Sequence, residues 1–301
     1  MFAYFRAPDR WTELARRTVV DTFADGCPGL AAQLAFYFLL ALFPAMLFVI
    51  ALVFMLPIEP ALEPVLARLD AVLPPDVLVL VRRQLDQLMQ GASGGLLTFG
   101  VAGALWSSSS AMTAIITALN RAYDIDETRA WWHQRALAIS LTVGMAVFAV
   151  TAFVLVVAGS DLAGWVAAQR GLGALFEQIW RFVQWPVVLL LIVFAVDLVY
   201  YFAPNADTRW VWLTPGSLLA TGLWLLASAG FKVYVQNFSN FAAVYGAIGG
   251  VIVLMLWFYL SGFALLVGAE LNAEIDRALE SRTGPPRSPE GRKRIGPAAA
   301  P

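Results

Sequence analysis

The sequence is poor in the residues that build metal sites and disulfide frameworks. Its 301 residues include one cysteine, Cys27, and one histidine, His133. A single cysteine excludes an intrachain disulfide, and one residue of each kind cannot supply a zinc site of three or four cysteine and histidine ligands. The motifs HExxH, GxxxxGK[ST] and GxSxG are absent too. We therefore expect no metal site, no cofactor, no catalytic residues and no enzymatic activity.

Charged residues are also scarce. They make up 14% of the chain, whereas hydrophobic residues make up 60%. A soluble domain has about 25% charged and about 45–50% apolar residues, so both departures indicate a membrane protein. The formal net charge of -1 shows no bias toward nucleic acid, and no nucleic-acid partner is expected. The first 25 residues lack an apolar core followed by a small-residue cleavage site, which argues against a secretory signal peptide.

Six segments are long and apolar enough to cross a bilayer, which takes about 20 residues. None of the six alternates apolar and polar residues, so helices are the way to satisfy their backbone in lipid. The sequence therefore predicts an all-α, polytopic membrane bundle of six transmembrane helices in a single domain over 1–280. The spans are expected at about 30–56, 96–119, 137–158, 182–202, 211–235 and 245–268.

Three segments that flank the spans differ from them in hydrophobic pattern or in composition. Residues 9–25 predict an N-terminal amphipathic helix, which either lies in the inner interface with its arginines toward anionic headgroups or packs on the bundle. Residues 57–93 predict two short amphipathic helices in the first outer loop. Residues 281–301, rich in proline, glycine, serine and arginine, predict a disordered cytoplasmic tail.

The basic residues predict the orientation. With six spans, both termini lie on one side, and that side carries 14 of the 20 lysine and arginine residues. An excess of basic residues marks the cytoplasmic side of a membrane protein. We therefore expect cytoplasmic N- and C-termini.

Four consecutive serines interrupt the second span in "LWSSSSAMTAIITALN", residues 105–120. On a helix, Ser109, Thr113 and Thr117 fall four residues apart, and Asn120 follows three later. Such side chains let helices pack closely and can bond to the carbonyl four residues earlier. The stripe is therefore either a packing surface or one wall of a polar cavity open to the cytoplasm.

Other positions stand out within the spans. Asp197 lies at depth, where a charge needs a partner, and either Asn120 or Arg121 is the expected one. Asp197 is either functional, part of a structural pair, or an interfacial carboxylate whose side chain snorkels toward the headgroups. Pro44 predicts a kink in the first span. Gly246 and Gly250 have the spacing of close helix contacts, within the chain or between copies.

Three stretches together resemble the YihY/virulence factor BrkB family of bacterial inner-membrane proteins. They are "AAQLAFYFLLALFPAMLF" (31–48), "ALNRAYDIDETRAWW" (118–132) and "VYGAIGGVIVLMLWFYLSGFALLVGAELNAE" (244–274), with "YFAPNADTRWVWLTPGSLLATGLW" (201–224) between the last two. The resemblance covers about residues 10–277. It implies a multi-pass protein of the bacterial inner membrane with six helices and both ends in the cytoplasm.

The resemblance singles out positions within these stretches. They are Asn120, Arg121, Tyr123, Glu127, Arg129, Pro204, Asn205, Tyr245, Gly246, Glu270 and Asn272. Glu270 is expected either to pair with Arg121 or Arg129, or to join Asn120, Arg121 and Asn272 in a polar cluster. Asp197 is not part of the family pattern, and Tyr201 stands where that pattern has a basic residue.

The resemblance implies no settled activity. Members of the family once carried the label ribonuclease BN, but a lone His133 argues against a zinc-dependent nuclease here. We expect a transporter or exporter-like protein for an amphipathic or lipid-like envelope substrate. The alternative is a non-catalytic membrane scaffold or envelope-integrity factor. Membrane lipids are the expected partners, and a homo-oligomer is left open.

Overall fold

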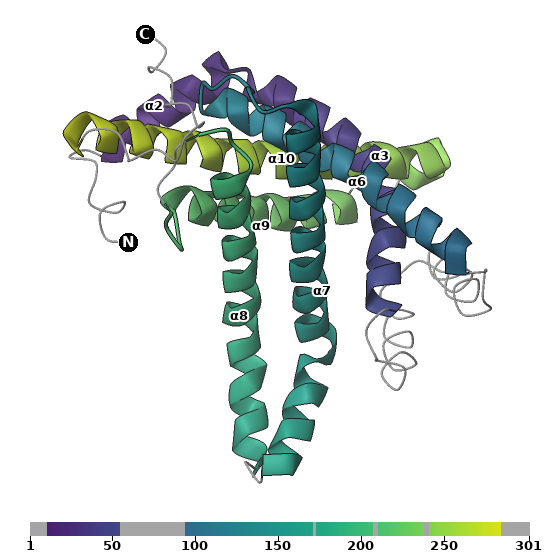
Figure 1. The fold of residues 1–301 in the computed structure, drawn as a ribbon. Helices are drawn as coiled ribbons and strands as arrows, with labels where there is room; N and C mark the ends of the chain where they lie inside the picture. Colours follow the sequence, from purple (N-terminus) through teal and green to yellow (C-terminus); the bar gives the residue numbers. More distant parts are fainter. Residues whose placement is uncertain (1–10, 55–93, 171–172, 207–209, 238–240, 284–301) are drawn as a thin grey trace. The chain divides into compact units, whose positions relative to one another are not determined.

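A computed structural model describes residues 11–54, 94–170, 173–206, 210–237 and 241–283. These residues form seven helices (Figure 1). Six of them are long and apolar enough to cross a membrane, which confirms the predicted all-α bundle of six spans. The helices are α2 (Trp11–Ala24), α3 (Cys27–Phe54), α6 (Gly94–Ala122), α7 (Trp131–Arg170), α8 (Gly173–Phe202), α9 (Pro215–Asn237) and α10 (Phe241–Thr283).

Helix α10 is longer than the predicted span. It continues to Thr283, well past the expected end at 268. Packing beyond the predicted span explains this extension, because Ile275 and Leu279 are buried in one cluster with Leu14 of α2 and Val211. Helix α2, predicted from the amphipathic pattern, therefore packs on the last turns of α10.

Helices α7 and α8 also extend beyond their predicted spans. Residues 159–170 continue α7 and residues 173–181 continue α8, where the sequence analysis placed a loop. The extension of α7, "GSDLAGWVAAQR", contains no proline, and half of its residues are the good helix formers Ala, Leu, Gln and Arg. Both predicted helices of the first outer loop lie outside the described residues. So does the predicted tail beyond Thr283, the last residue of α10.

Internal contacts divide the chain into two compact units. The first comprises Met1–Ala41, Ser109–Leu141 and Val193–Pro301, and the second comprises Leu42–Ser108 and Thr142–Ile192. Helices α2, α9 and α10 therefore belong to the first unit. The expectation of one domain over 1–280 stays a prediction.

In the second unit, small side chains bring helices together. Phe48, Ala104 and Ala146 form a buried cluster that joins α3, α6 and α7. Helix α7 approaches α8 at Gly159, where an added Cβ would stand 2.8 Å from the amide oxygen of Gln184. Many large apolar side chains in this unit face outward, among them Phe182, which is 79% exposed. Hydrocarbon is the environment that makes such exposure favourable.

In the first unit, two glycines let α9 and α10 pack closely. A Cβ on Gly216 would collide with the carbonyl oxygen of Gly268 and with Asn272. A Cβ on Gly268 would collide with the carbonyl oxygen of Gly216 and the hydroxyl of Tyr200. Helix backbones this close need residues without side chains. The contact between α9 and α10 is therefore set by Gly216 and Gly268.

The other glycine pair singled out by the sequence has a different setting. An added Cβ on Gly250 meets no atom of the described chain within 4 Å. The side-chain surroundings of Gly246 lie outside the described residues. A helix contact through these two residues stays a prediction, as does a kink at Pro44, which lies inside α3.

Candidate functional site

Polar and charged side chains gather in the first unit, at the ends of α6, α8 and α10 and the start of α9. They form three networks. We call them the loop clamp (Asn120, Glu127, Arg129 and Asn205), the helix cap (Asp197, Thr214, Ser217 and Asn272) and the acidic cluster (Asp21, Asp25, Asp124, Glu270 and Glu274). The first two networks hold backbone in place, whereas the third concentrates negative charge.

The loop clamp joins the segment after α6 to the segment after α8. The amide of Asn120 donates to a Glu127 carboxylate oxygen at 2.8 Å, and its oxygen accepts the backbone N–H of Asn205 at 2.7 Å. Arg129 donates to both oxygens of Glu127 and to the carbonyl of Ala203 at 2.8 Å. Burial acts to raise the pKa of Glu127, but the hydrogen bonds from Arg129 outweigh it and lower that pKa overall.

A pocket of about 310 Å³ opens beside this clamp. Its lining comes from the last turn of α6 and the segment that follows, and includes Asn120, Arg121 and Ile125. Asp124 stands at the turn with a positive φ of 52°, a conformation that aspartate tolerates better than most residues. The pocket thus combines amide, charged and apolar groups on a backbone that the clamp holds in one conformation.

The hydroxyl stripe of α6 ends in this pocket. Thr113 donates to the carbonyl of Ser109 and Thr117 donates to the carbonyl of Thr113, both at 3.1 Å. The predicted bonds to the carbonyl four residues earlier are therefore present. Ser109 is fully buried, whereas Thr117 is exposed and lines the pocket. Thr113 accepts from Arg135 of α7 at 3.5 Å. One stripe therefore packs at one end and borders the pocket at the other.

The helix cap explains the buried carboxylate at position 197. Its Oδ1 accepts the Thr214 hydroxyl at 2.6 Å and the Thr214 backbone N–H at 3.2 Å. Thr214 in turn accepts the N–H of Ser217, so it caps α9, whose first residue is Pro215. Asn272 of α10 donates to the Thr214 hydroxyl and accepts the N–H of Gly216. A carboxylate here also meets the positive end of the α9 dipole.

The partner expected for Asp197 was therefore wrong. Asn120 is bonded to Glu127 and Asn205, and Arg121 lies 3.7 Å from Asp25. The physical reason is that α9 begins at the depth of Asp197. The hydroxyl and N–H groups at this helix start are donors that a charge-pairing argument overlooks.

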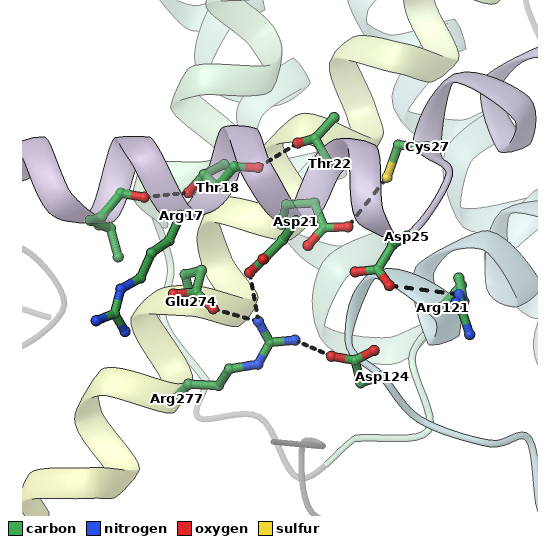
Figure 2. Close-up of polar contacts among 12 residues, drawn as sticks. Arg17, Thr18, Asp21, Thr22, Asp25, Cys27, Arg121, Asp124, Glu274 and Arg277 are labelled. Atoms are coloured by element: carbon green, nitrogen blue, oxygen red, sulfur yellow. Dashed lines mark hydrogen bonds and ion pairs between the residues drawn. The ribbon is translucent and has the colours of Figure 1, made fainter. Parts of the chain in front are cut away.

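Arg277 holds the acidic cluster together. Its guanidinium donates to Asp124 at 2.6 Å, to Asp21 at 3.4 Å and to Glu274 one turn away on α10. Figure 2 shows these contacts of Arg277, to which α2, α10 and the segment after α6 each contribute a carboxylate. The Arg277 side chain is only 11% exposed. One buried cation therefore faces three carboxylates from three parts of the chain.

Two carboxyls of the cluster outside the spans have raised pKa values. Burial, reinforced by repulsion from Glu274, raises the pKa of Asp21 to about 6. Burial and repulsion from Asp124 likewise raise the pKa of Asp25. By contrast, hydrogen bonds from Arg16 and Arg17 lower the pKa of the exposed Glu13 to about 2. Burial thus raises the pKa of Asp21 and Asp25, whereas paired arginines lower that of the exposed Glu13.

Glu270 has a different partner from those expected. Its Oε1 accepts the thiol of Cys27 at 3.2 Å, whereas Arg129 bonds to Glu127 and Arg121 lies beside Asp25. Glu270 is fully buried, and its Oε2 makes no hydrogen bond within the described chain. The predicted pairs with Arg121 and Arg129 were wrong, because the start of α3 lies against α10 here.

The structure does not gather the predicted cluster into one network. Asn120 belongs to the loop clamp, Asn272 to the helix cap and Glu270 to the acidic cluster. Arg121 lines the pocket and faces Asp25. The four residues nevertheless lie in the first unit.

Sequence reasoning missed several members of these networks. Asp21, Asp25 and Arg277 were not singled out from the sequence, and Cys27 served only to exclude a disulfide and a zinc site. One signal was available, because Asp21 falls on the same helical face as Leu14 and Thr18, which are buried against α10. An acidic residue on a packing face of an amphipathic helix needs a partner in the opposing helix.

The amphipathic helix α2 packs on the bundle and also has an exposed face. Leu14, Thr18 and Asp21 are buried on one face of α2, whereas Val19 and Phe23 are exposed on another, Phe23 by 65%. Arg16 and Arg17 are exposed as well and pair with Glu13. The helix packs on α10 and still presents apolar and basic groups outward. Contact with headgroups stays a prediction.

Comparison with known proteins identifies close relatives. A family model described as Virulence factor BrkB matches residues 19–292. The chain is 37% identical over 243 residues to a "Putative ribonuclease-like protein YfkH" of Bacillus subtilis, which covers 81% of this chain and 88% of that protein. No solved structure matches the chain.

Two membrane proteins are similar over different lengths. One UPF0761 membrane protein, from Alkalilimnicola ehrlichii, is 29% identical over 261 residues, which covers 82% of this chain and 55% of that protein. Another, from Aeromonas salmonicida, is 43% identical over 76 residues, or 25% of this chain and 26% of that protein. The chain therefore spans only part of the length of these two relatives.

Proposed function

Since the chain belongs to the virulence factor BrkB family and is a multi-pass membrane protein, we propose that it transports an amphipathic or lipid-like envelope substrate. The bacterial inner membrane, with both termini in the cytoplasm, is the proposed location. The observation that carries the proposal is the pocket of about 310 Å³ at the end of the α6 hydroxyl stripe. A headgroup-sized cavity on a membrane helix suits a molecule with a polar end.

The chemistry of the pocket supports such a substrate. Asn120 and Thr117 offer neutral hydrogen-bonding groups, Arg121 and Asp124 offer both signs of charge, and Ile125 offers an apolar contact. The side chain of Arg121 is 60% exposed, so it is available to an anionic group. Ligand pockets typically combine apolar surface with a few placed polar groups.

The loop clamp supports the proposal by fixing the pocket walls. Glu127, Arg129 and Asn205 hold the segment after α6 through charge-assisted and amide hydrogen bonds. Binding to a preformed site avoids the cost of ordering loops when the ligand arrives. The clamp joins two of the stretches that carry the family resemblance, which gives those residues a shared task.

The test is transbilayer movement of a fluorescent phospholipid in vesicles containing the purified full-length chain. Phosphatidylethanolamine and phosphatidylglycerol probes distinguish headgroups, and quenching by dithionite reads out movement. We expect flux above that of empty vesicles, lowered by Asn120→Leu, which breaks the clamp, and by Thr117→Val, which removes a pocket hydroxyl. Thr221→Val on α9 is the matched control, since its hydroxyl is buried without a partner in the described chain.

Two results would overturn the proposal. Flux equal to that of empty vesicles for both probes would rule out lipid movement by this protein. Equal flux in Asn120→Leu, Thr117→Val and the control would rule out a role for the pocket. We propose no nuclease activity, because one histidine and one cysteine cannot form the zinc site of such an enzyme. Nuclease activity that co-purifies and disappears in His133→Ala would contradict this.

The outward face of α2 favours a second candidate, a membrane scaffold or envelope-integrity factor. Val19, Val20 and Phe23 are exposed beside Arg16 and Arg17, which suits contact with anionic lipid or a partner. Crosslinking in membranes separates the candidates. A stoichiometric partner, a second copy included, that crosslinks through position 23 while vesicles show no flux would favour the scaffold.

A further inference from the structure

Glu270 is a buried carboxyl group, and one of its two oxygens makes no hydrogen bond within the described residues. It is 0% exposed, and Cys27 supplies its one hydrogen bond within the described residues, to Oε1. A thiol is a weak donor. Oε2 is buried and bonds to no group of the described chain. An ionised carboxylate in this state lacks the partners that a buried charge requires, whereas a neutral carboxylic acid costs far less to bury.

The surroundings of Glu270 hold more negative than positive charge. Asp21 of α2, Asp25 of the turn before α3 and Arg277 of α10 are the charged groups that act on it most strongly. Arg277 is already shared among three carboxylates. The Arg121 side chain is 60% exposed and lies 3.7 Å from Asp25. Neither cation is therefore committed to Glu270.

Further titratable groups from the packed elements add no positive charge. On α10 they are Glu274, one turn beyond Glu270, and Asp276. From the segment after α6 they are Asp124 and the phenol of Tyr123, whose pKa is raised well above its usual value by burial and by Asp276. From α8, Asp197 is bonded within the helix cap. A proton on Glu270 would reduce the excess of negative charge in this part of the molecule.

We propose that the acidic cluster is a proton-binding site in which Glu270 takes up an exchangeable proton on Oε2. The carboxylate takes a proton from a hydronium ion: one O–H bond forms on Oε2, one O–H bond of the hydronium breaks to leave water, and the Glu270 side chain becomes neutral. This rests on the proposed function where it adds that the proton is the coupling ion of transport. Among the described residues, no grouping of three or more histidine, cysteine, aspartate and glutamate side chains is placed to hold a metal ion, which favours a proton over a divalent cation.

The site has a route by which protonation could act on the fold. Glu270, Glu274 and Arg277 lie on one face of α10, and Arg277 ties that face to Asp21 on α2 and Asp124 beside the pocket. Loss of the proton adds a negative charge next to Asp21 and Asp25 and changes the competition for Arg277. The same arginine therefore connects the proton site to the pocket wall.

The first test measures proton binding independently of transport. Infrared spectra of the purified full-length protein in lipid nanodiscs, recorded from about pH 5 to about pH 9, report the carbonyl stretch of protonated carboxylic acids. We expect a band at neutral pH that Glu270→Gln removes and Glu13→Gln leaves unchanged. Glu13 is the matched control because it is exposed and its pKa is about 2.

A second variant keeps the test decisive if Glu270→Gln folds poorly. Cys27→Ser replaces the thiol by a hydroxyl, a stronger donor to an ionised carboxylate, so the band should disappear at lower pH than in the wild type. Absence of the band at neutral pH, its full retention in Glu270→Gln, or a response to sodium or potassium at constant pH would each overturn the proposal.

The second test separates the proton from the transport. Vesicle flux is measured with and without an imposed pH gradient, in wild type and Glu270→Gln. Flux that depends on the gradient in wild type and loses that dependence in Glu270→Gln supports proton coupling. Wild-type flux that ignores the gradient overturns coupling while leaving transport intact. Zero flux beside a positive infrared result overturns the proposed function but leaves the proton site.

Discussion

At the scale of single residues, Arg277 is the side chain on which the acidic cluster depends. It contacts Asp21, Asp124 and Glu274 from a position that is 11% exposed. Removing one partner of a buried ionic network leaves uncompensated charge, which costs about 3–5 kcal/mol. We expect Arg277→Met to lower stability by about this amount, measured as thermal unfolding of the full-length protein in detergent.

The matched control for Arg277 is an arginine in an exposed pair. Arg16 pairs with Glu13 at 3.0 Å, and its side chain is 65% exposed. Exposed ion pairs contribute little because water and salt screen them. Arg16→Met should therefore leave the unfolding temperature unchanged. Equal losses in both variants would show that the contacts of Arg277 have no special role.

Asp21 should give the protein a measurable pH dependence. Its pKa is about 6 in the folded state against 3.8 for an unperturbed aspartate, so folding disfavours its ionised form. Its contribution to stability is present below pH 3.8 and is lost as the pH rises through about 6. Relative to Asp21→Asn, the wild type should therefore lose stability between these pH values. Parallel unfolding curves at every pH would contradict the burial of this carboxyl.

The sequence was informative about which residues are unusual and uninformative about their partners. Asp197 was singled out because a charge inside a span is costly, Glu270 was singled out by the family resemblance, and both are buried. Their partners, Thr214 and Cys27, lie 17 and 243 positions away along the chain. A hydroxyl and a thiol carry no charge, so an argument based on complementary charge could not find them.

At the scale of elements, the start of α9 is held by Thr214 and by side chains from α8 and α10. Thr214 accepts the N–H of Ser217, donates to Asp197 and accepts the amide of Asn272. Thr214→Val keeps the shape and removes all three hydrogen bonds. We expect a loss of about 1–3 kcal/mol in unfolding free energy, from the lost cap and the groups left unpaired.

Thr221→Val is the control on the same helix. The hydroxyl of Thr221 is buried without a hydrogen-bond partner in the described chain, so its removal should be neutral or stabilising. Thermal unfolding of both variants under one detergent condition gives the comparison. A loss in Thr221→Val as large as that in Thr214→Val would mean that volume, rather than capping, sets the cost.

The sequence predicted that the six membrane helices exist, but it did not predict where they end. Apolar runs of about 20 residues identified all six spans, but α10 continues to Thr283 because Ile275 and Leu279 are buried with Leu14. Such an extension depends on packing against a second helix. The hydropathy of a single segment carries no information about that packing. The loop clamp is similar, since Asn120 and Asn205 meet only when two connections fold side by side.

At the scale of the whole molecule, the orientation in the membrane is open to a direct test. Cys27 is buried, so the wild-type chain should label weakly with a membrane-impermeant maleimide. Single cysteines at the predicted tail, Ser288→Cys, and the predicted outer loop, Gln90→Cys, should differ in spheroplasts. We expect Gln90→Cys to label in intact spheroplasts and Ser288→Cys to label only after lysis. The reverse pattern would invert the predicted orientation.

The sequence by itself determined that hydrocarbon surrounds this chain, that six helices cross it, and that polar residues recur within and beside those helices. These properties follow from the composition of each segment, because the cost of exposing backbone and charge to lipid applies locally. Only the tertiary structure decided which polar groups meet. Pairs such as Cys27 and Glu270 depend on the register of packed helices, and close approaches like that of Gly216 and Gly268 set this register between distant segments.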